Sequence, residues 1–146
     1  MTSLPMILVL HGPNLDRLGR REPEIYGSES LDEINNRISD HADSLGVAVT
    51  MRQSNHEGHL IDWLYEAEDE GVKAVLLNAG GFTHTSVALR DAVAAINVPV
   101  IEVHLSNTSR REDFRHRSLM APVCKGTISG FGALSYTLGL DAAARL

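Results

Sequence analysis

The sequence is poor in cysteine and lacks any long hydrophobic run. Cys124 is the one cysteine among 146 residues, so no disulfide can form within the chain. The apolar stretch at residues 6–10 is too short for a secretory signal and follows no basic residue. No stretch approaches the ~20 apolar residues that a membrane span needs. We therefore expect a cytoplasmic protein with no membrane partner.

Basic residues are also scarce. Thirteen Lys and Arg against nineteen Asp and Glu give a formal net charge of −6, which on average repels nucleic acids and anionic membrane surfaces. Lys73 and Lys125 are the two lysines, whereas seven of the eleven arginines lie in two short segments, residues 17–21 and 110–117. The protein thus concentrates its positive charge in two places, and nucleic acid is not an expected partner.

Short apolar segments alternate with segments of helical period along the chain. Strands are predicted at residues 6–10, 47–53, 74–78, 98–104 and 124–129, and helices at residues 31–45, 59–70, 86–96 and 132–146. Ser30 and Glu33 fit a capping box, and Gly46, Gly71 and Asn97 stand where helices return to strands. This alternation predicts one α/β domain over residues 1–146, a flavodoxin-like doubly wound five-stranded parallel sheet with helices on both faces.

The predicted fold also predicts the position of a site. Ligands of open parallel sheets bind beyond the carboxyl ends of the strands, and polar segments follow the first four predicted strands. Both arginine-rich segments fall at this end. A cleft lined by cations attracts a small anionic molecule, so we expect an anion site there rather than a merely solvated surface.

Four segments, HGPNL, GRREPEIYG, NAGGFTHTSVALRD and EVHLSN, resemble in order and spacing those of type II 3-dehydroquinate dehydratase. The resemblance runs from about residue 6 to the last helix, with His11 standing where many relatives carry asparagine. It implies reversible dehydration of 3-dehydroquinate to 3-dehydroshikimate, by anti elimination through an enolate, in aromatic amino acid biosynthesis or quinate breakdown. It implies no metal and no organic cofactor.

The residues suit such a reaction. Removing a proton beside a ketone needs a base, and Tyr26 is the candidate. A free tyrosine has a pKa of about 10, so it acts as a base only if a neighbouring positive charge favours the phenolate, and Arg21 supplies a charge that is never lost. Gly19 and Gly27 are candidate hinges for a lid that closes over the substrate.

His104 is the candidate acid that protonates the departing hydroxyl. Glu102 lies two residues earlier on the same strand, so its side chain points to the same side and can orient the imidazole. From the residues alone, a purely structural Glu and His pair is equally consistent. Asn14 resembles the residue that stabilises the enolate in the family, and a turn-forming asparagine is its alternative interpretation.

The resemblance also implies substrate contacts. Asn78, His84 and Arg115 match positions that bind ring hydroxyls, and Leu105 and Ser106 match the segment that receives the carboxylate. A carboxylate accepts several short hydrogen bonds, so backbone donors suit this task.

Asp91 matches an aspartate that reaches the site of a neighbouring subunit in relatives, although its default interpretation is an ordinary helix-surface residue. The assembly that the resemblance implies is a homododecamer, a tetramer of trimers.

Two other functional classes stay open at this point. A non-catalytic flavodoxin-like module that binds a small anionic ligand is the main alternative. A metal-dependent hydrolase is the other, but His56, Glu57 and His59 do not have the HExxH spacing of zinc enzymes. Both lysines fall at strand starts, away from the predicted site, so a Schiff-base mechanism has no obvious nucleophile.

Overall fold

The structure of the chain, a computed structural model, describes residues 3–146. The predicted domain of residues 1–146 includes Met1 and Thr2, which lie outside the described residues. The strands are β1 (Met6–His11), β2 (Ala48–Gln53), β3 (Ala74–Asn78), β4 (Val100–His104) and β5 (Gly126–Ser129). The α-helices are α1 (Pro23–Tyr26), α2 (Leu31–Leu45), α3 (Glu57–Glu70), α4 (Val87–Ala95) and α5 (Leu134–Ala144).

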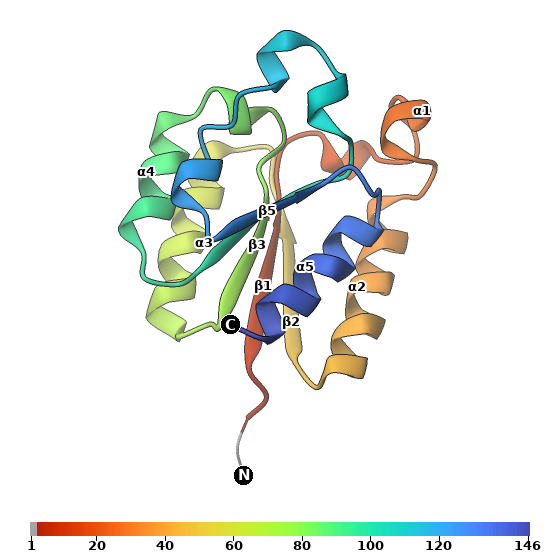
Figure 1. Ribbon diagram of the computed structural model, residues 1–146. Coiled ribbons are helices and arrows are strands. Elements are labelled where there is room, and N and C mark those ends of the chain that lie inside the picture. Colours follow the sequence, from red (N-terminus) through yellow and green to blue (C-terminus); the bar gives the residue numbers. More distant parts are fainter. Residues whose placement is uncertain (1–2) are drawn as a thin grey trace.

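Within residues 3–146, five parallel strands form one sheet in the order β2-β1-β3-β4-β5. β1 lies between β2 and β3, so the chain first moves to one side of β1 and then returns past it to build the other half. This is the strand order of flavodoxin-like sheets, and it confirms the predicted fold class. The carboxyl ends of β1 and β3, where the direction of winding reverses, meet at the loop-rich end of the molecule (Figure 1).

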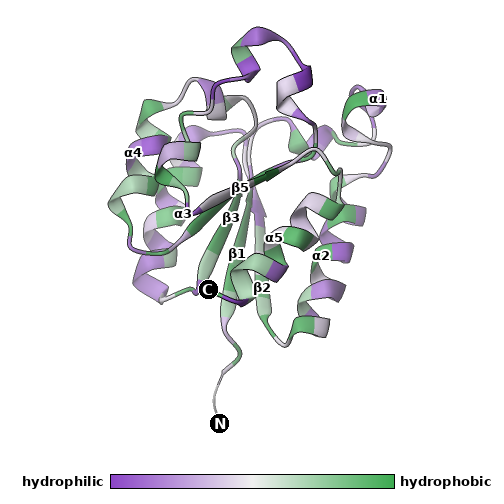
Figure 2. Ribbon diagram, viewed as in Figure 1, coloured by the Kyte–Doolittle hydropathy of each residue, from purple (hydrophilic) through white to green (hydrophobic). Residues whose placement is uncertain are grey.

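Helices cover both faces of the sheet, with α2 and α5 on one face and α3 and α4 on the other (Figure 1). Successive β1 residues alternate between two cores: Ile7 and Val9 pack toward α2 and α5, and Leu8 and Leu10 pack toward α3 and α4. The three inner strands β1, β3 and β4 are accordingly mostly apolar, and hydrophilic residues gather on the outer helix faces and the loops (Figure 2). No helix in residues 3–146 is long and apolar enough to cross a membrane.

Several predicted boundaries are confirmed, including those of α2 and β3. The Ser30 hydroxyl accepts a hydrogen bond from the Glu33 N–H while the Glu33 carboxylate accepts one from the Ser30 N–H, so the capping box is formed. Gly46 and Gly71 end α2 and α3 in left-handed conformation, with φ of 71° and 69°.

Other boundaries differ for local reasons. β4 begins at Val100 rather than at residue 98, because Pro99 has no N–H for the ladder. β5 begins at Gly126 rather than at residue 124, because the Cys124 N–H donates to the Ala121 carbonyl and closes the 3₁₀ turn Ala121–Val123. The polar, arginine-rich segment after β4 contains 3₁₀ turns at Thr108–Arg110 and Asp113–Arg115.

Candidate active site

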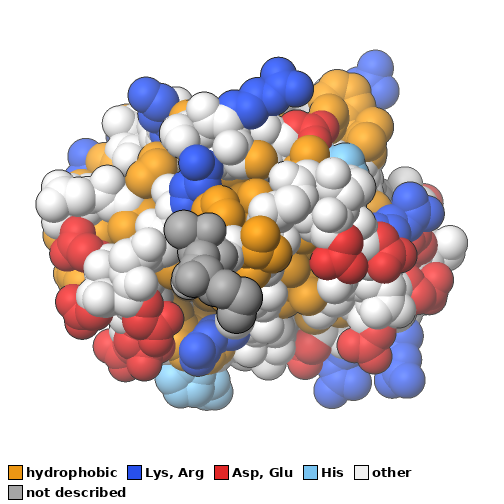
Figure 3. Space-filling view, turned by 90° about the horizontal axis from the view of Figure 1, so that it is seen from below, with side chains coloured by type: hydrophobic (Ala, Val, Ile, Leu, Met, Phe, Trp, Pro, Cys, Tyr) orange, Lys and Arg blue, Asp and Glu red, His pale blue; other side chains and the backbone are white. Residues whose placement is uncertain are grey.

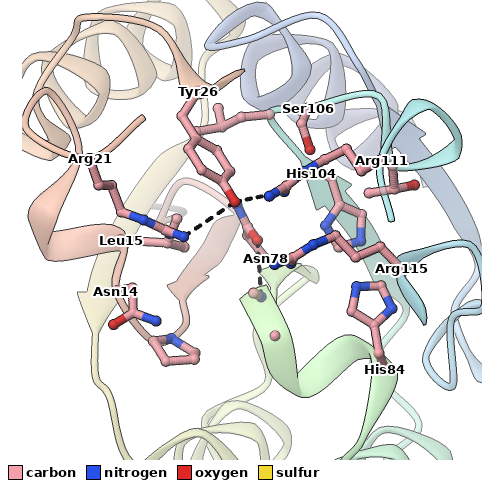
Figure 4. A pocket seen from close by; sticks show the side chains of 15 residues that line it. Asn14, Leu15, Arg21, Tyr26, Asn78, His84, His104, Ser106, Arg111 and Arg115 are labelled. Atoms are coloured by element: carbon pink, nitrogen blue, oxygen red, sulfur yellow. Dashed lines mark hydrogen bonds between the residues drawn. The ribbon is translucent and has the colours of Figure 1, made fainter. Parts of the chain in front are cut away.

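A pocket opens beyond the carboxyl ends of β1, β3 and β4, as the topology predicts (Figure 4). Its empty volume of about 620 Å³ includes the solvent at its open mouth. Its lining residues come from the loops after these strands: Pro13, Asn14, Leu15, Arg21, Tyr26, Asn78, Gly80, Gly81, His84, His104, Leu105, Ser106, Thr108, Arg111 and Arg115.

The loop after β1 is held tightly against β3. The Gly12 N–H donates to the Asn78 carbonyl at 2.8 Å, and a Cβ at Gly12 would lie 2.7 Å from the Ala79 carbonyl oxygen, so only glycine fits there. Asn14 adopts a left-handed conformation, with φ of 70°, and its N–H donates to the Asn55 side-chain oxygen at 2.9 Å. This geometry places the Asn14 side chain on the pocket wall (Figure 4).

The connector of residues 18–27 forms the one-turn helix α1, which sequence analysis did not predict. Pro23 starts the turn, and Glu22 before it is left-handed with φ of 37°. The turn brings Arg21 back onto Tyr26: Nη2 of Arg21 donates to the Tyr26 hydroxyl at 3.3 Å, and its Cζ lies 4.4 Å from the ring centroid. The guanidinium therefore contacts both the face and the oxygen of the phenol.

A second arginine contacts the same hydroxyl from the opposite side. Nη1 of Arg111 donates to the Tyr26 oxygen at 2.6 Å, and the Arg111 side chain is only 10% exposed (Figure 4). The sequence pattern does not single out Arg111, although it places the whole arginine-rich segment at the correct end of the sheet. The sequence feature that points to this site is the cluster of four arginines at residues 110–117, but a cluster does not show which arginine side chain faces the pocket.

His104 and Glu102 form a buried pair at the end of β4. The carboxylate oxygen Oε2 of Glu102 accepts a hydrogen bond from Nε2 of His104 at 2.6 Å, which fixes the proton on that nitrogen. Ser118 and Thr127 also donate to this carboxylate. Burial acts to raise the pKa of Glu102, but the hydrogen bond and positive charge of His104, with the two hydroxyls, outweigh it and hold the pKa below the usual value. The ionised carboxylate thus orients His104 and leaves Nδ1 available to a ligand.

Polar side chains on the opposite wall have defined orientations. Nδ1 of His84 donates to the Arg117 carbonyl at 2.8 Å, so Nε2 is the ring nitrogen left for a ligand. Nε of Arg115 donates to the Glu112 carboxylate at 3.0 Å, and its guanidinium lies over the Phe114 ring, 4.7 Å from the centroid. Both side chains line the pocket (Figure 4).

The turn after β4 presents Leu105 and Ser106 to the pocket. Gly130 and Gly132, both with positive φ, donate their N–H groups to the His104 and Leu105 carbonyls at 3.3 and 2.9 Å. These hydrogen bonds fix the direction of the peptide groups around Ser106, which is 8% exposed.

Nine of the eleven residues predicted for the site line this pocket: Asn14, Arg21, Tyr26, Asn78, His84, His104, Leu105, Ser106 and Arg115. The two others lie elsewhere. Glu102 is buried behind His104, and Asp91 lies on α4 outside the pocket, with its carboxylate 3.2 Å from Nη1 of Arg90.

The pocket is the positive part of an acidic protein. Among the described residues, its lining contains Arg21, Arg111 and Arg115 and no Asp or Glu. At the opposite end of the molecule, acidic side chains gather on two sides of an apolar centre, with Lys and Arg side chains among them (Figure 3). Neither Lys73 nor Lys125 lines the pocket, and residues 3–146 hold no group of three or more His, Cys, Asp or Glu placed to bind a metal ion. Because the described lining holds three arginines and no carboxylate side chain, it favours binding of a small anion in the pocket.

Comparison with known proteins agrees with this geometry. The family model for class II dehydroquinases matches residues 5–144. The chain is 60% identical to a 3-dehydroquinate dehydratase of a Nostoc species, over 92% of this chain and 91% of that protein, and 56% identical to one of Trichodesmium erythraeum, over 93% and 90%. The crystal structure of a type II dehydroquinase from Butyrivibrio crossotus superposes with a TM-score of 0.95 at 43% identity, covering 97% of this chain and 99% of that one.

Proposed function

Because the chain belongs to the class II dehydroquinase family, we propose that its pocket dehydrates 3-dehydroquinate to 3-dehydroshikimate by anti elimination through an enolate. The chain is a lyase, a 3-dehydroquinate dehydratase of the shikimate pathway, rather than a non-catalytic binding module. Tyr26 acts as the base and His104 as the acid. The observation that carries this assignment is the Tyr26 hydroxyl held between two guanidinium groups.

Proton abstraction depends on the ionised form of Tyr26. Arg21 and Arg111 each donate a hydrogen bond to its oxygen, and each brings a permanent positive charge to the ring. Hydrogen bonds and positive charge both favour the phenolate over the phenol. The phenolate then takes the proton from the carbon beside the ketone, and the electron pair of the broken C–H bond forms the enolate.

The second step expels the hydroxyl group. The enolate reforms the ketone, its electron pair makes the new carbon–carbon double bond, and the carbon–oxygen bond breaks. His104 enters this step as the imidazolium, paired through Nε2–H with the Glu102 carboxylate, and its Nδ1–H supplies the proton that turns the leaving group into water. Glu102 keeps Nε2 protonated and the ring in place, so it is a positioning residue. Asn14 lies on the wall beside Leu15 and stabilises the enolate oxygen through a bound water.

Substrate binding divides between two groups of residues. Asn78, His84 and Arg115 contact ring hydroxyls, and the backbone and hydroxyl of the Leu105–Ser106 turn receive the carboxylate. The positive lining supports this assignment, because the substrate is an anion.

The connector of residues 18–27 acts as a lid with hinges at Gly19 and Gly27, which have φ of 87° and 90°. Asp91 serves the pocket of a neighbouring subunit in a homododecamer built from trimers, and its exposure outside its own pocket supports this role. One functional domain over residues 1–146 and a cytoplasmic location stay predictions.

The test adds 3-dehydroquinate to purified protein and follows the absorbance of the conjugated enone. Tyr26→Phe should lower kcat by about 100-fold or more with little change in KM, because the base acts on the barrier. Tyr65→Phe is the matched control, since Tyr65 lies on α3 and is 43% exposed. Wild-type turnover in Tyr26→Phe would refute the assignment of the base, and loss of turnover on treatment with a metal chelator would favour a metal-dependent mechanism.

A further inference from the structure

A buried hydrogen-bond chain runs from the core to the pocket. The Tyr136 hydroxyl lies 2.8 Å from Nδ1 of His11 and 3.0 Å from Nδ2 of Asn78, and Nε2 of His11 lies 2.8 Å from the Asn35 side-chain oxygen. His11 and Tyr136 are fully buried, and Asn78 is 3% exposed. The chain links α2, β1, β3 and α5, and only Asn78 reaches the pocket (Figure 4).

The direction of every hydrogen bond in this chain follows from the groups at its two ends, the Gly80 N–H and the Asn35 side-chain oxygen. The Gly80 N–H can only donate, and it donates to Oδ1 of Asn78 at 3.2 Å. Nδ2 of Asn78 therefore faces Tyr136 and donates to the hydroxyl oxygen. At the other end of the chain, Nε2 of His11 donates to the Asn35 side-chain oxygen, so the neutral ring accepts at Nδ1 and the Tyr136 hydroxyl donates to it.

Burial keeps both groups in the neutral forms that this direction requires. Burial, opposed by the hydrogen bond to Asn35, lowers the pKa of His11 to about 4. Burial, opposed by the Asn78 N–H, raises the pKa of Tyr136 above its usual value. Throughout the neutral range, His11 accepts and Tyr136 donates.

We propose that Tyr136 and His11 are positioning residues that lock the Asn78 amide, so that its second N–H is presented to the substrate. The role assigned to Asn78 rests on the proposed function. The lock makes Asn78 a fixed donor, and the substrate oxygen beside it must accept. A free amide would also sample the flipped orientation, which presents an oxygen to that position and weakens binding.

Kinetics separate this role from simple packing. Because Asn78 binds the substrate before and during reaction alike, loss of the lock should raise KM and leave kcat nearly unchanged. A residue that only stabilises the fold would lower the amount of active enzyme, and hence the apparent kcat, at constant KM. Tyr136→Phe removes the hydroxyl and keeps the ring, so it is the primary variant.

We expect Tyr136→Phe to raise KM about tenfold, the change that corresponds to about 1.4 kcal/mol of binding free energy. In an Asn78→Ala background the same substitution should raise KM no further, because the residue through which Tyr136 acts is absent. His11→Leu should behave like Tyr136→Phe. His11→Asn should restore most of the affinity, since an asparagine oxygen can lie where Nδ1 accepts from Tyr136.

An unchanged KM in Tyr136→Phe, or equal rises in KM with and without Asn78, would overturn the proposal. The ¹⁵N-resolved side-chain amide of Asn78 gives a reading that needs no substrate. Its hydrogens should exchange with solvent at least about tenfold faster in Tyr136→Phe than in the wild type. Equal exchange rates would refute the lock even if the proposed function holds, whereas faster exchange in a protein that does not turn over 3-dehydroquinate would refute only the function.

Discussion

Acidification should destabilise this protein through His11, a residue that does not touch the pocket. The pKa of His11 lies at about 4 in the folded chain against an ordinary value of 6.5. As pH falls, the unfolded chain therefore binds a proton at this residue before the folded chain does. The effect of His11 on the free energy of unfolding is absent above about pH 6.5 and grows as the pH falls from 6.5 to about 4. Below about pH 4, protonation of His11 has lowered the free energy of unfolding by roughly 3 kcal/mol. At pH 5 the expected loss is about 2 kcal/mol.

Urea unfolding at fixed protein concentration, measured at pH 7 and pH 5 in the wild type and in His11→Asn, tests this expectation. The asparagine variant lacks the titrating group, so its free energy of unfolding should fall by about 2 kcal/mol less than that of the wild type over this interval. Glu102, whose pKa lies below its usual value, loses its stabilising contribution only at still lower pH and does so in both proteins. Parallel pH dependence in the two proteins would show that His11 is not a buried neutral group.

Three further predictions follow from other parts of the molecule. Arg111→Ala should lower kcat at least tenfold, because it removes one of the two positive charges beside the Tyr26 hydroxyl. Arg110 is exposed and lies outside the pocket, so Arg110→Ala should leave kcat nearly unchanged. Equal loss of turnover in the two variants, measured by enone absorbance, would contradict this prediction. Burial, with the negative charge of Glu102, raises the pKa of Cys124 to about 12. Iodoacetamide at pH 8 should therefore label Cys124 at least about 100-fold more slowly in the folded protein than in the urea-unfolded chain. Equal labelling rates would refute this prediction. Ser30→Ala should reduce the free energy of unfolding by about 1 kcal/mol through loss of the capping box, and an unchanged urea midpoint would count against this.

Sequence patterns predicted the elements of this fold better than their ends. The period of α2 and its capping box lie within a single segment, so both boundaries could be read directly. The start of β5 depends instead on a turn that takes the N–H of Cys124, and α1 is a single turn whose four residues are too few to show a helical period. Such features depend on local hydrogen bonds that hydrophobic periodicity does not record.

The residues of the site also fall into two groups, those that the sequence could place and those that it could not. Residues at or just beyond the carboxyl end of a strand, such as Asn14, Asn78 and His104, could be placed because the topology brings these strand ends together. Arg111 could not be selected from its neighbours, since the segment after β4 has no period that shows which side chains point inward. The hydrogen-bonding role of the Tyr136 hydroxyl could not be predicted either, because α5 is mostly apolar and a tyrosine there is expected to be an ordinary core residue.

The two arginines at Tyr26 differ in a way that bears on catalysis. Arg21 lies five residues from Tyr26 and arrives with α1, whereas Arg111 arrives from beyond β4 and is nearly buried. Within the described chain, its Nε has no hydrogen-bond partner, and the nearest carboxylate, Glu112, is 3.8 Å away. Removing a guanidinium from water without a close counter-charge is costly. In the proposed mechanism, a phenolate at Tyr26 places that counter-charge 2.6 Å from Nη1, which offsets part of the free energy spent in burying Arg111.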